Sequence, residues 1–228
     1  MSRSDELQEF LQETRNYLSL CKEMKWAEYV MVPKTIPVSV NQQTLERLRE
    51  EVNNCNKCIL SETRTNVVFG EGNNSPDVVF IGEAPGRDED SQGKPFVGRA
   101  GQLLTKIIQA MGFNREDVYI ANILKCRPPD NRNPLPNEIK LCEPYLIHQL
   151  EILRPRVIIA LGTFAAQTLL KTEEPIGKLR GKMHFYHQIP LMPTYHPAFL
   201  LRSPGKKRDV WQDIKQVMVL LSSSETSD

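Results

Sequence analysis

The sequence predicts an α/β fold with a central parallel four-stranded sheet flanked by helices. Short apolar segments alternate along the chain with longer segments of helical periodicity, which is the order of strands and helices in parallel sheets. The first apolar segment, DVVFIG at 77–82, is apolar on both faces, as a strand buried between two layers of helices is. A chain of 228 residues can also bury such a core without disulfides.

Four segments have the length and composition of strands and lie between turn residues. They cover 77–82, 117–122, 156–162 and the region around 189–194. Parallel strands end at the same edge of a sheet, and ligands of open α/β sheets bind at that edge. Three loops therefore qualify as parts of a site: Gly82–Gly86, Asn122–Pro129 and Tyr195–Arg202.

Helical periodicity separates these strands and closes the chain. The predicted helices lie at 100–113, 137–153, 163–170 and 207–221. Thr163 is placed to cap the third of these helices, and the second is expected to tolerate Pro144 inside it, with a kink.

The chain before the first strand has a different character. Residues 5–24 show one apolar stripe at helical spacing, and Pro33 and Pro37 indicate a linker. The sequence therefore predicts three parts: an N-terminal helical extension and linker at 1–40, an α/β domain at 41–222, and a tail at 223–228.

The charge of the chain does not by itself indicate a partner, because the net charge is +1 and the pI about 7.6. Residues 176–210, however, hold seven Lys or Arg against one acid, Asp209, so this segment is either a solvated face or a surface for an anionic partner. No segment reaches the roughly 18 apolar residues that a membrane span needs. The N-terminus MSRSDELQEF is too acidic and polar for a signal peptide. We expect a cytoplasmic protein without a membrane partner.

The cysteine spacing suggests a metal centre. Cys55 and Cys58 form a C-x-x-C pair before the first strand, Cys126 follows the second strand, and Cys142 lies sixteen positions further on. In a reducing compartment four thiolates suit either zinc or an iron–sulfur cluster, and the spacing does not choose between them. Cys142 taken alone would be read as a small buried apolar residue, and Cys21 is expected to be one.

Two of the strand-end loops suggest a pocket for a flat, neutral ring. The loop Gly82–Gly86 lacks the phosphate-binding motifs, Pro85 removes a donor, and Glu83 places a carboxylate where phosphate would lie. The acids of 83–90 either bind a divalent cation or form a solvated turn. Asn122 has the donor and acceptor needed to recognise the edge of a nucleobase, or else it caps a turn. Phe96 is either a stacking platform or a core aromatic.

The third loop, YHPAFLLR at 195–202, combines a histidine with an apolar and basic segment. Pro197 stiffens the backbone beside His196, although a single histidine at a strand end is more often structural. The leucines at 200 and 201 followed by Arg202 have the composition of an apolar wedge with a phosphate anchor, as in proteins that enter the minor groove.

Taken together, four motifs and four cysteines resemble family 4 uracil-DNA glycosylases, the iron–sulfur members of their superfamily. The motifs are GEAPGRDED, GKPFVGRAGQLL, YIANILKCRPP and HPAFLLR. The resemblance covers roughly residues 53–221 and leaves out the first 50. It implies the three-layer sandwich of uracil-DNA glycosylases, formed here by the 41–222 domain. It also implies hydrolysis of the N-glycosidic bond of deoxyuridine in DNA, which leaves an abasic site and initiates base excision repair.

The resemblance also implies roles for individual residues. It implies a structural [4Fe-4S] cluster on Cys55, Cys58, Cys126 and Cys142. The uracil pocket is then walled by Glu83, Ala84 and Pro85. Phe96 stacks on the flipped base, Asn122 donates to O4 and accepts from N3–H, and His196 donates to O2. On the DNA, Leu200 fills the gap left by the flipped base and Arg202 holds a phosphate.

The chain departs from related enzymes in two places. No aspartate stands in the first loop, where family 1 members hold the attacking water, so Glu89 is the nearest candidate, with Glu83 also in the catalytic set. Arg87 and Asp88 replace two acids that are frequent in the family. The segment CRPPDNRNPLPNE has no histidine, which argues against the branch that bonds covalently to uracil and favours turnover.

Two other functions are compatible with parts of the pattern. A Cys₄-stabilised module could bind DNA or nucleotides without chemistry, but it would need no leaving-group donor such as His196. A zinc hydrolase using Glu83 and His196 would need more ligands than the loops supply. We expect a monomer that acts on single- and double-stranded uracil-containing DNA, with residues 1–50 either docking a protein partner or covering the core.

Overall fold

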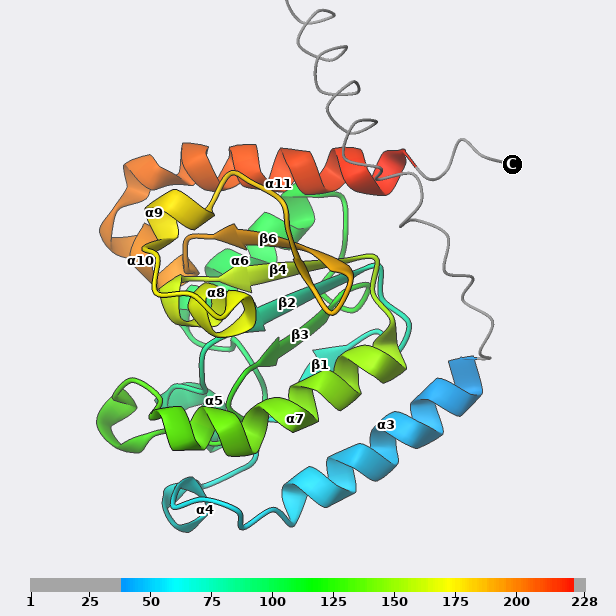
Figure 1. The fold of residues 1–228 in the computed structure, drawn as a ribbon, viewed down its shortest axis with the longest axis vertical. Coiled ribbons are helices and arrows are strands. Elements are labelled where there is room, and N and C mark those ends of the chain that lie inside the picture. The colour runs from blue at the N-terminus through cyan, green and yellow to red at the C-terminus, as the bar shows by residue number, and fades with distance from the viewer. Residues whose placement is uncertain (1–37, 224–228) are drawn as a thin grey trace, which may run out of the picture. The chain divides into compact units, whose positions relative to one another are not determined.

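A computed structural model describes residues 38–223, which form one six-stranded sheet with helices on both faces (Figure 1). The strands are β1 (Glu71–Gly72), β2 (Val78–Gly82), β3 (Tyr119–Asn122), β4 (Val157–Leu161), β5 (His184–Tyr186) and β6 (Ile189–Thr194). Their order across the sheet is β1-β3-β2-β4-β6-β5. The helix expected at 5–24, the linker prolines and Cys21 lie outside the described residues.

The four predicted strands form the parallel centre of the sheet, but the expectation of a purely parallel four-stranded sheet was wrong. β3, β2, β4 and β6 pair in parallel, whereas β1 and β5 add antiparallel edges. Both edge strands are too short to show alternation, with two and three residues. β5 joins β6 through His187 and Gln188, whose φ angles of 46° and 66° form a tight turn without the glycine that usually marks one.

The helices are α3 (Val38–Asn53), α4 (Leu60–Thr63), α5 (Arg87–Gln92), α6 (Arg99–Ala110), α7 (Pro136–Leu153), α8 (Thr163–Leu170), α9 (Ile176–Leu179), α10 (Pro197–Arg202) and α11 (Lys207–Ser222). Short 3₁₀ turns cover η1 (Pro129–Asn131) and η2 (Pro204–Lys206). Thr163 is the first residue of α8 and not its cap, because Gly162 holds the N-cap position without a side-chain bond. Pro144 lies inside α7, as expected.

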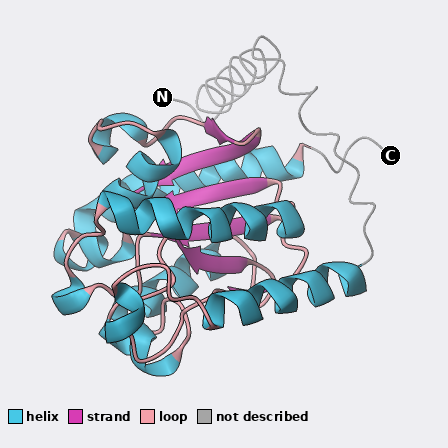
Figure 2. Ribbon diagram, turned by 60° about the horizontal axis from the view of Figure 1, so that its bottom comes forward, coloured by secondary structure: helices cyan, strands magenta, loops and turns pink. Residues whose placement is uncertain are grey.

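The central strands are buried on both faces, which is why their sequences read as continuous apolar runs. One face carries Val79, Ile81 and Ile158 into a core with apolar side chains of α3, α7 and α8. α7 and α8 lie in front of the sheet in Figure 1, with α6 behind it, and Figure 2 shows the same layering from another side. Leu45, Leu48 and Val52 of α3 are buried in this core, so α3 is part of the packed domain.

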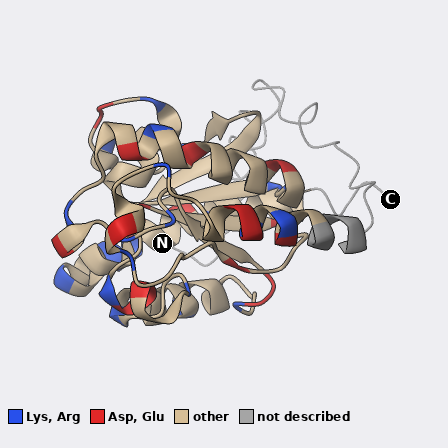
Figure 3. Cartoon of the chain, turned by 90° about the horizontal axis from the view of Figure 1, so that it is seen from below, with Lys and Arg blue, Asp and Glu red and all other residues tan. Residues whose placement is uncertain are grey.

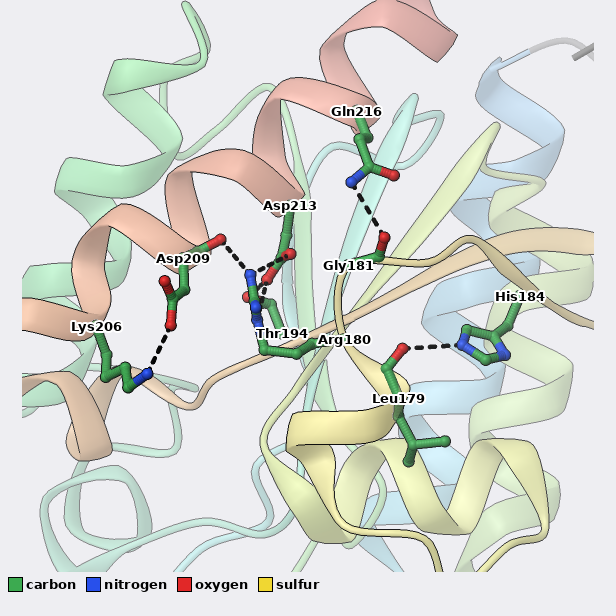
Figure 4. A network of polar contacts seen from close by, with 9 residues as sticks. All are labelled: Leu179, Arg180, Gly181, His184, Thr194, Lys206, Asp209, Asp213 and Gln216. Carbon is green, nitrogen blue, oxygen red and sulfur yellow. Dashed lines mark hydrogen bonds and ion pairs between the residues drawn. The ribbon is translucent and has the colours of Figure 1, made fainter. Parts of the chain in front are cut away.

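A buried polar network joins α11 to the end of β6 (Figure 4). Both oxygens of Asp213, which is fully buried, accept from Arg180 at 2.7 and 3.1 Å, and Thr194 Oγ1 donates to Asp213 at 2.6 Å. Arg180 also donates to the backbone carbonyl of Asp209. Two basic residues of the segment 176–210 are therefore already paired within the protein. Arg180 pairs with the buried Asp213, and Lys206 forms an exposed ion pair with Asp209 at 3.0 Å. The network holds the strand end that leads into His196.

Replacing Asp213 with alanine should destabilise the fold strongly, because it leaves Arg180 as an unpaired, mostly buried cation. We expect the free energy of unfolding to fall by about 3–5 kcal/mol, measured by urea denaturation. Asp209→Ala is the matched control, because it removes an exposed ion pair with Lys206 and leaves the backbone contact to Arg180 intact. Equal losses in the two variants would contradict this role for Asp213.

Candidate active site

The ends of β2 and β3 bring Gly82, Asn122 and Phe96 together. Gly82 and Asn122 are register partners in the parallel pair of strands. A Cβ at Gly82 would overlap Asn122 Oδ1 and lie 2.7 Å from Cζ of Phe96. The absence of a side chain at Gly82 therefore lets the amide of Asn122 and the ring of Phe96 both lie against its backbone.

The amide of Asn122 is the most informative group at this edge of the sheet. Asn122 is 2% exposed, and among the described residues its Oδ1 is the only buried side-chain N or O atom without a hydrogen-bond partner. Leaving a buried acceptor unpaired costs about 1–3 kcal/mol. Such a cost is typical of a group that binds a ligand, and a ligand that satisfies this oxygen must bring a hydrogen-bond donor.

Phe96 is held in an unusual backbone conformation, with a φ of 51°. Glu89 Oε1 accepts from the backbone amides of the two residues that follow Phe96, Val97 at 3.0 Å and Gly98 at 3.1 Å. This carboxylate oxygen therefore fixes the loop that follows Phe96, which differs from the water-holding role predicted for Glu89. The ring of Phe96 lies 5.6 Å from the ring of His196, centroid to centroid.

His196 is positioned as a neutral hydrogen-bond donor. It caps α10, and its Nδ1 accepts from the backbone amide of Ala198 at 3.1 Å, which leaves the proton on Nε2. Burial, with a smaller contribution from Arg202, lowers the pKa of His196 to about 4, although Glu89 opposes this shift. Gly162, with a φ of 92°, lets β4 approach closely, since a Cβ there would lie 2.9 Å from Cβ of His196.

The loop after β2 forms a wall beside these residues. Its backbone is tied to the chain after β3, because the amides of Ile123 and Leu124 donate to the carbonyls of Gly82 and Glu83 at 3.0 Å each. Burial raises the pKa of Glu83 to about 7, and within residues 38–223 no hydrogen bond is made by its carboxyl group. Ala84 is half-buried and Pro85 is buried.

The helix after His196 carries the leucines of the predicted wedge. Leu200 is 1% exposed and packs inside the protein, whereas Leu201 is 40% exposed. Leu200 would have to leave the core to enter a duplex, so the accessible apolar side chain is that of Leu201. Arg202 is exposed, and its positive charge contributes to the lowered pKa of His196, so it lies near that histidine.

The four cysteines predicted to bind metal line one cavity, together with Arg64 and Lys125. None is in a disulfide. Arg64 Nη1 donates to Sγ of Cys126 at 3.2 Å, and the backbone amide of Lys125 donates to Sγ of Cys142 at 3.3 Å. Within the described part of the chain, no three His, Cys, Asp or Glu side chains converge tightly enough to share one metal ion.

Lys125 lies between this cavity and Asn122, and it is 1% exposed. Its Nζ donates to two neutral groups, the backbone carbonyl of Asn122 at 2.8 Å and Oε1 of Gln149 at 2.6 Å. Gln149 in turn donates to the carbonyl of Phe69 and to the hydroxyl of Tyr119. Burial lowers the pKa of Lys125 to about 8, and thiolate charge on the neighbouring cysteines acts in the opposite direction.

The surface charge is mixed. Basic and acidic residues are interspersed in Figure 3, in agreement with the net charge of +1. In the part of the chain that the structure describes, no helix is long and apolar enough to span a membrane.

Comparisons with known proteins give the class to which this fold and site belong. Residues 69–215 match the model of the uracil DNA glycosylase superfamily, and the chain belongs to that superfamily. Within it, the chain is a member of the type-4 uracil-DNA glycosylases. It is 46% identical to the enzyme of that name from Saccharolobus solfataricus, over 78% of this chain and 87% of the relative. The Archaeoglobus fulgidus and Thermotoga maritima enzymes are each 44% identical, over 77% of this chain and 92% and 93% of theirs.

Several residues that organise the site were not singled out from the sequence. Lys125, Gln149 and Asp213 are buried polar residues, and Arg115 donates to the backbone carbonyl of Pro95, beside Phe96. Lys125 carried a signal, because a lysine between a strand end and a cysteine predicted to bind metal interrupts an apolar run. The other three lie on elements whose sequence gives no sign of the partner they meet in space.

Proposed function

We propose that the pocket formed by Gly82, Asn122 and Phe96 binds a uracil that has been flipped out of DNA. The unpaired Oδ1 of Asn122 is the observation that carries this proposal. Uracil supplies the missing donor at N3–H and an acceptor for the amide N–H at O4. Cytosine presents the reverse pattern, so it would leave both groups of Asn122 buried and unpaired. Phe96 stacks on the base, and the Glu83–Pro85 wall limits the space at its edge.

His196 stabilises the leaving group. As the N-glycosidic bond breaks, negative charge develops on uracil O2, and a donor fixed at that point lowers the barrier. The bond from Ala198 to Nδ1 leaves Nε2–H free to donate, and the lowered pKa keeps the ring neutral at physiological pH. A neutral donor stabilises the anion without transferring its proton.

Glu83 is the group that we propose for positioning the attacking water. Its carboxyl group is free of other hydrogen bonds among the described residues, and its pKa of about 7 suits the acceptance of a proton near neutral pH. Glu89 is engaged instead with the amides of Val97 and Gly98. Water then adds to the anomeric carbon of the sugar, and the products are free uracil and an abasic site.

The DNA contacts lie on α10, beside the pocket. The exposed Leu201 is suited to fill the gap that the flipped base leaves in the stack, and Arg202 is suited to hold a neighbouring phosphate. An extruded base enters the same pocket from a single strand or a duplex, although extrusion from a duplex also costs the energy of unpairing, and we expect both to be substrates.

The residues present also fit a [4Fe-4S] cluster on Cys55, Cys58, Cys126 and Cys142. All four thiols line one cavity. The cavity already contains two cations, since Arg64 donates to Cys126 and the buried ammonium of Lys125 has only neutral hydrogen-bond acceptors. A cluster with four thiolates carries the negative charge that would offset them. When bound, it crosslinks α7 to the loops after α3 and β3.

The pH dependence of catalysis should report Glu83. On single- and double-stranded oligonucleotides with one uracil, followed by alkaline cleavage, we expect kcat to rise with an apparent pKa near 7, because the carboxyl group must be ionised. Glu83→Gln should lower kcat and flatten this profile. A Glu83→Gln variant with the wild-type profile would refute the assignment of Glu83.

His196→Ala should lower kcat about 100-fold or more with a much smaller change in DNA binding.

Loss of one cysteine should remove the cluster. We expect wild-type protein purified without oxygen to be brown and to contain iron and sulfide, and Cys55→Ser to be pale and to melt at a lower temperature. Ser91→Ala, at an exposed position of α5 that does not line the cysteine cavity, is the control. A colourless wild type that holds stoichiometric zinc would contradict the cluster assignment.

A further inference from the structure

Phe96 adopts a backbone conformation that phenylalanine disfavours. Its φ of 51° lies in the left-handed region, which costs a non-glycine residue of order 1–2 kcal/mol and persists only where the surroundings hold it. The ring nevertheless faces the pocket, next to Gly82 and the ring of His196. Some part of the structure must therefore fix the backbone on both sides of Phe96.

On the C-terminal side, Glu89 and α6 provide this constraint. Glu89 Oε1 accepts from the amides of Val97 and Gly98. Gly101 lets α6 lie directly against Phe96, because a Cβ at this glycine would overlap the carbonyl group of Phe96.

On the N-terminal side, the constraint comes from Arg115, in the loop between α6 and β3. Its Nη2 donates to the carbonyl of Pro95 at 2.5 Å, and its Nη1 donates to Thr105 Oγ1 of α6 at 3.4 Å. Glu71 of β1 lies 4.0 Å from the same guanidinium and also pairs with Lys94. The guanidinium thus links α6 and the edge strand β1 to Pro95, the residue before Phe96. The Arg115 side chain is 25% exposed.

We propose that Arg115 is a positioning residue for base recognition, which holds the Pro95 carbonyl and so keeps the Phe96 ring in the orientation that stacks on uracil. The inference rests on the proposed stacking role of Phe96. Arg115 acts only through that ring and touches neither the DNA nor the base. It should therefore affect uracil binding more than the chemical step.

The test is a double-mutant cycle between Arg115→Met and Phe96→Ala in the full-length, cluster-containing enzyme. The readouts are kcat and KM on a single-stranded uracil oligonucleotide, inhibition by free uracil, and the melting temperature. We expect Arg115→Met to raise KM and the inhibition constant of uracil on the order of tenfold, with a smaller change in kcat. In the Phe96→Ala background the same substitution should change them by less than about twofold.

Two further variants separate positioning from general damage. Arg115→Lys keeps one donor for the Pro95 carbonyl and should recover part of the uracil affinity. Lys106→Met removes an exposed cation from α6 and should match the wild type. If Arg115→Met does not fold, the cycle is run with Arg115→Lys. We then expect a smaller rise in KM, which again disappears in the Phe96→Ala background.

The proposal is overturned if the Arg115 substitution has the same effect with and without the Phe96 ring. It is also overturned if uracil affinity is unchanged, or if only the melting temperature falls. Excision of uracil by the wild type is measured in the same series, so failure of the proposed function would show itself as an inactive wild type.

Discussion

The site depends on one constraint, which is that a carboxamide is buried at the end of a central strand with its acceptor unpaired. The parallel pairing of β2 with β3 puts Asn122 beside Gly82, and the lack of a side chain there lets the amide and the ring of Phe96 lie close together. The other parts of the pocket follow from this placement. The ring of Phe96 lies beside this amide at Gly82 and 5.6 Å from the ring of His196, so the three side chains are close neighbours.

The surrounding polar residues support this geometry through hydrogen bonds. Lys125, itself bonded to Gln149, donates to the backbone carbonyl of Asn122. The bond between Thr194 and Asp213 holds the strand that leads to His196. Glu89 accepts from the backbone of the loop that follows Phe96. Buried networks of this kind are rigid when every member is paired. Rigidity matters here, because a leaving-group donor lowers the barrier only if it already lies where charge develops.

The sequence predicted the parallel centre of the sheet and the strand-end loops, because continuous apolar runs and loop motifs are local signals. It did not predict β1 and β5, whose two and three residues pair only because the folded sheet presents an edge to them. The sequence also could not show that, on the short helix α10, Leu200 is buried and Leu201 is exposed. Contacts such as Arg115 with Pro95 join residues 20 positions apart, and no local pattern encodes them.

The most direct test of the account is base selectivity in Asn122→Asp. Matched oligonucleotides with a single uracil or a single cytosine are treated with the wild type and the variant and then cleaved with alkali. The excision rates are compared for protein samples that have the same melting temperature. We predict that the wild type prefers uracil by about 10⁴ or more. The variant should lose most of its uracil activity, because a carboxylate oxygen would face O4 in place of the amide donor. A variant that removes uracil with wild-type rate and selectivity would contradict the role of Asn122.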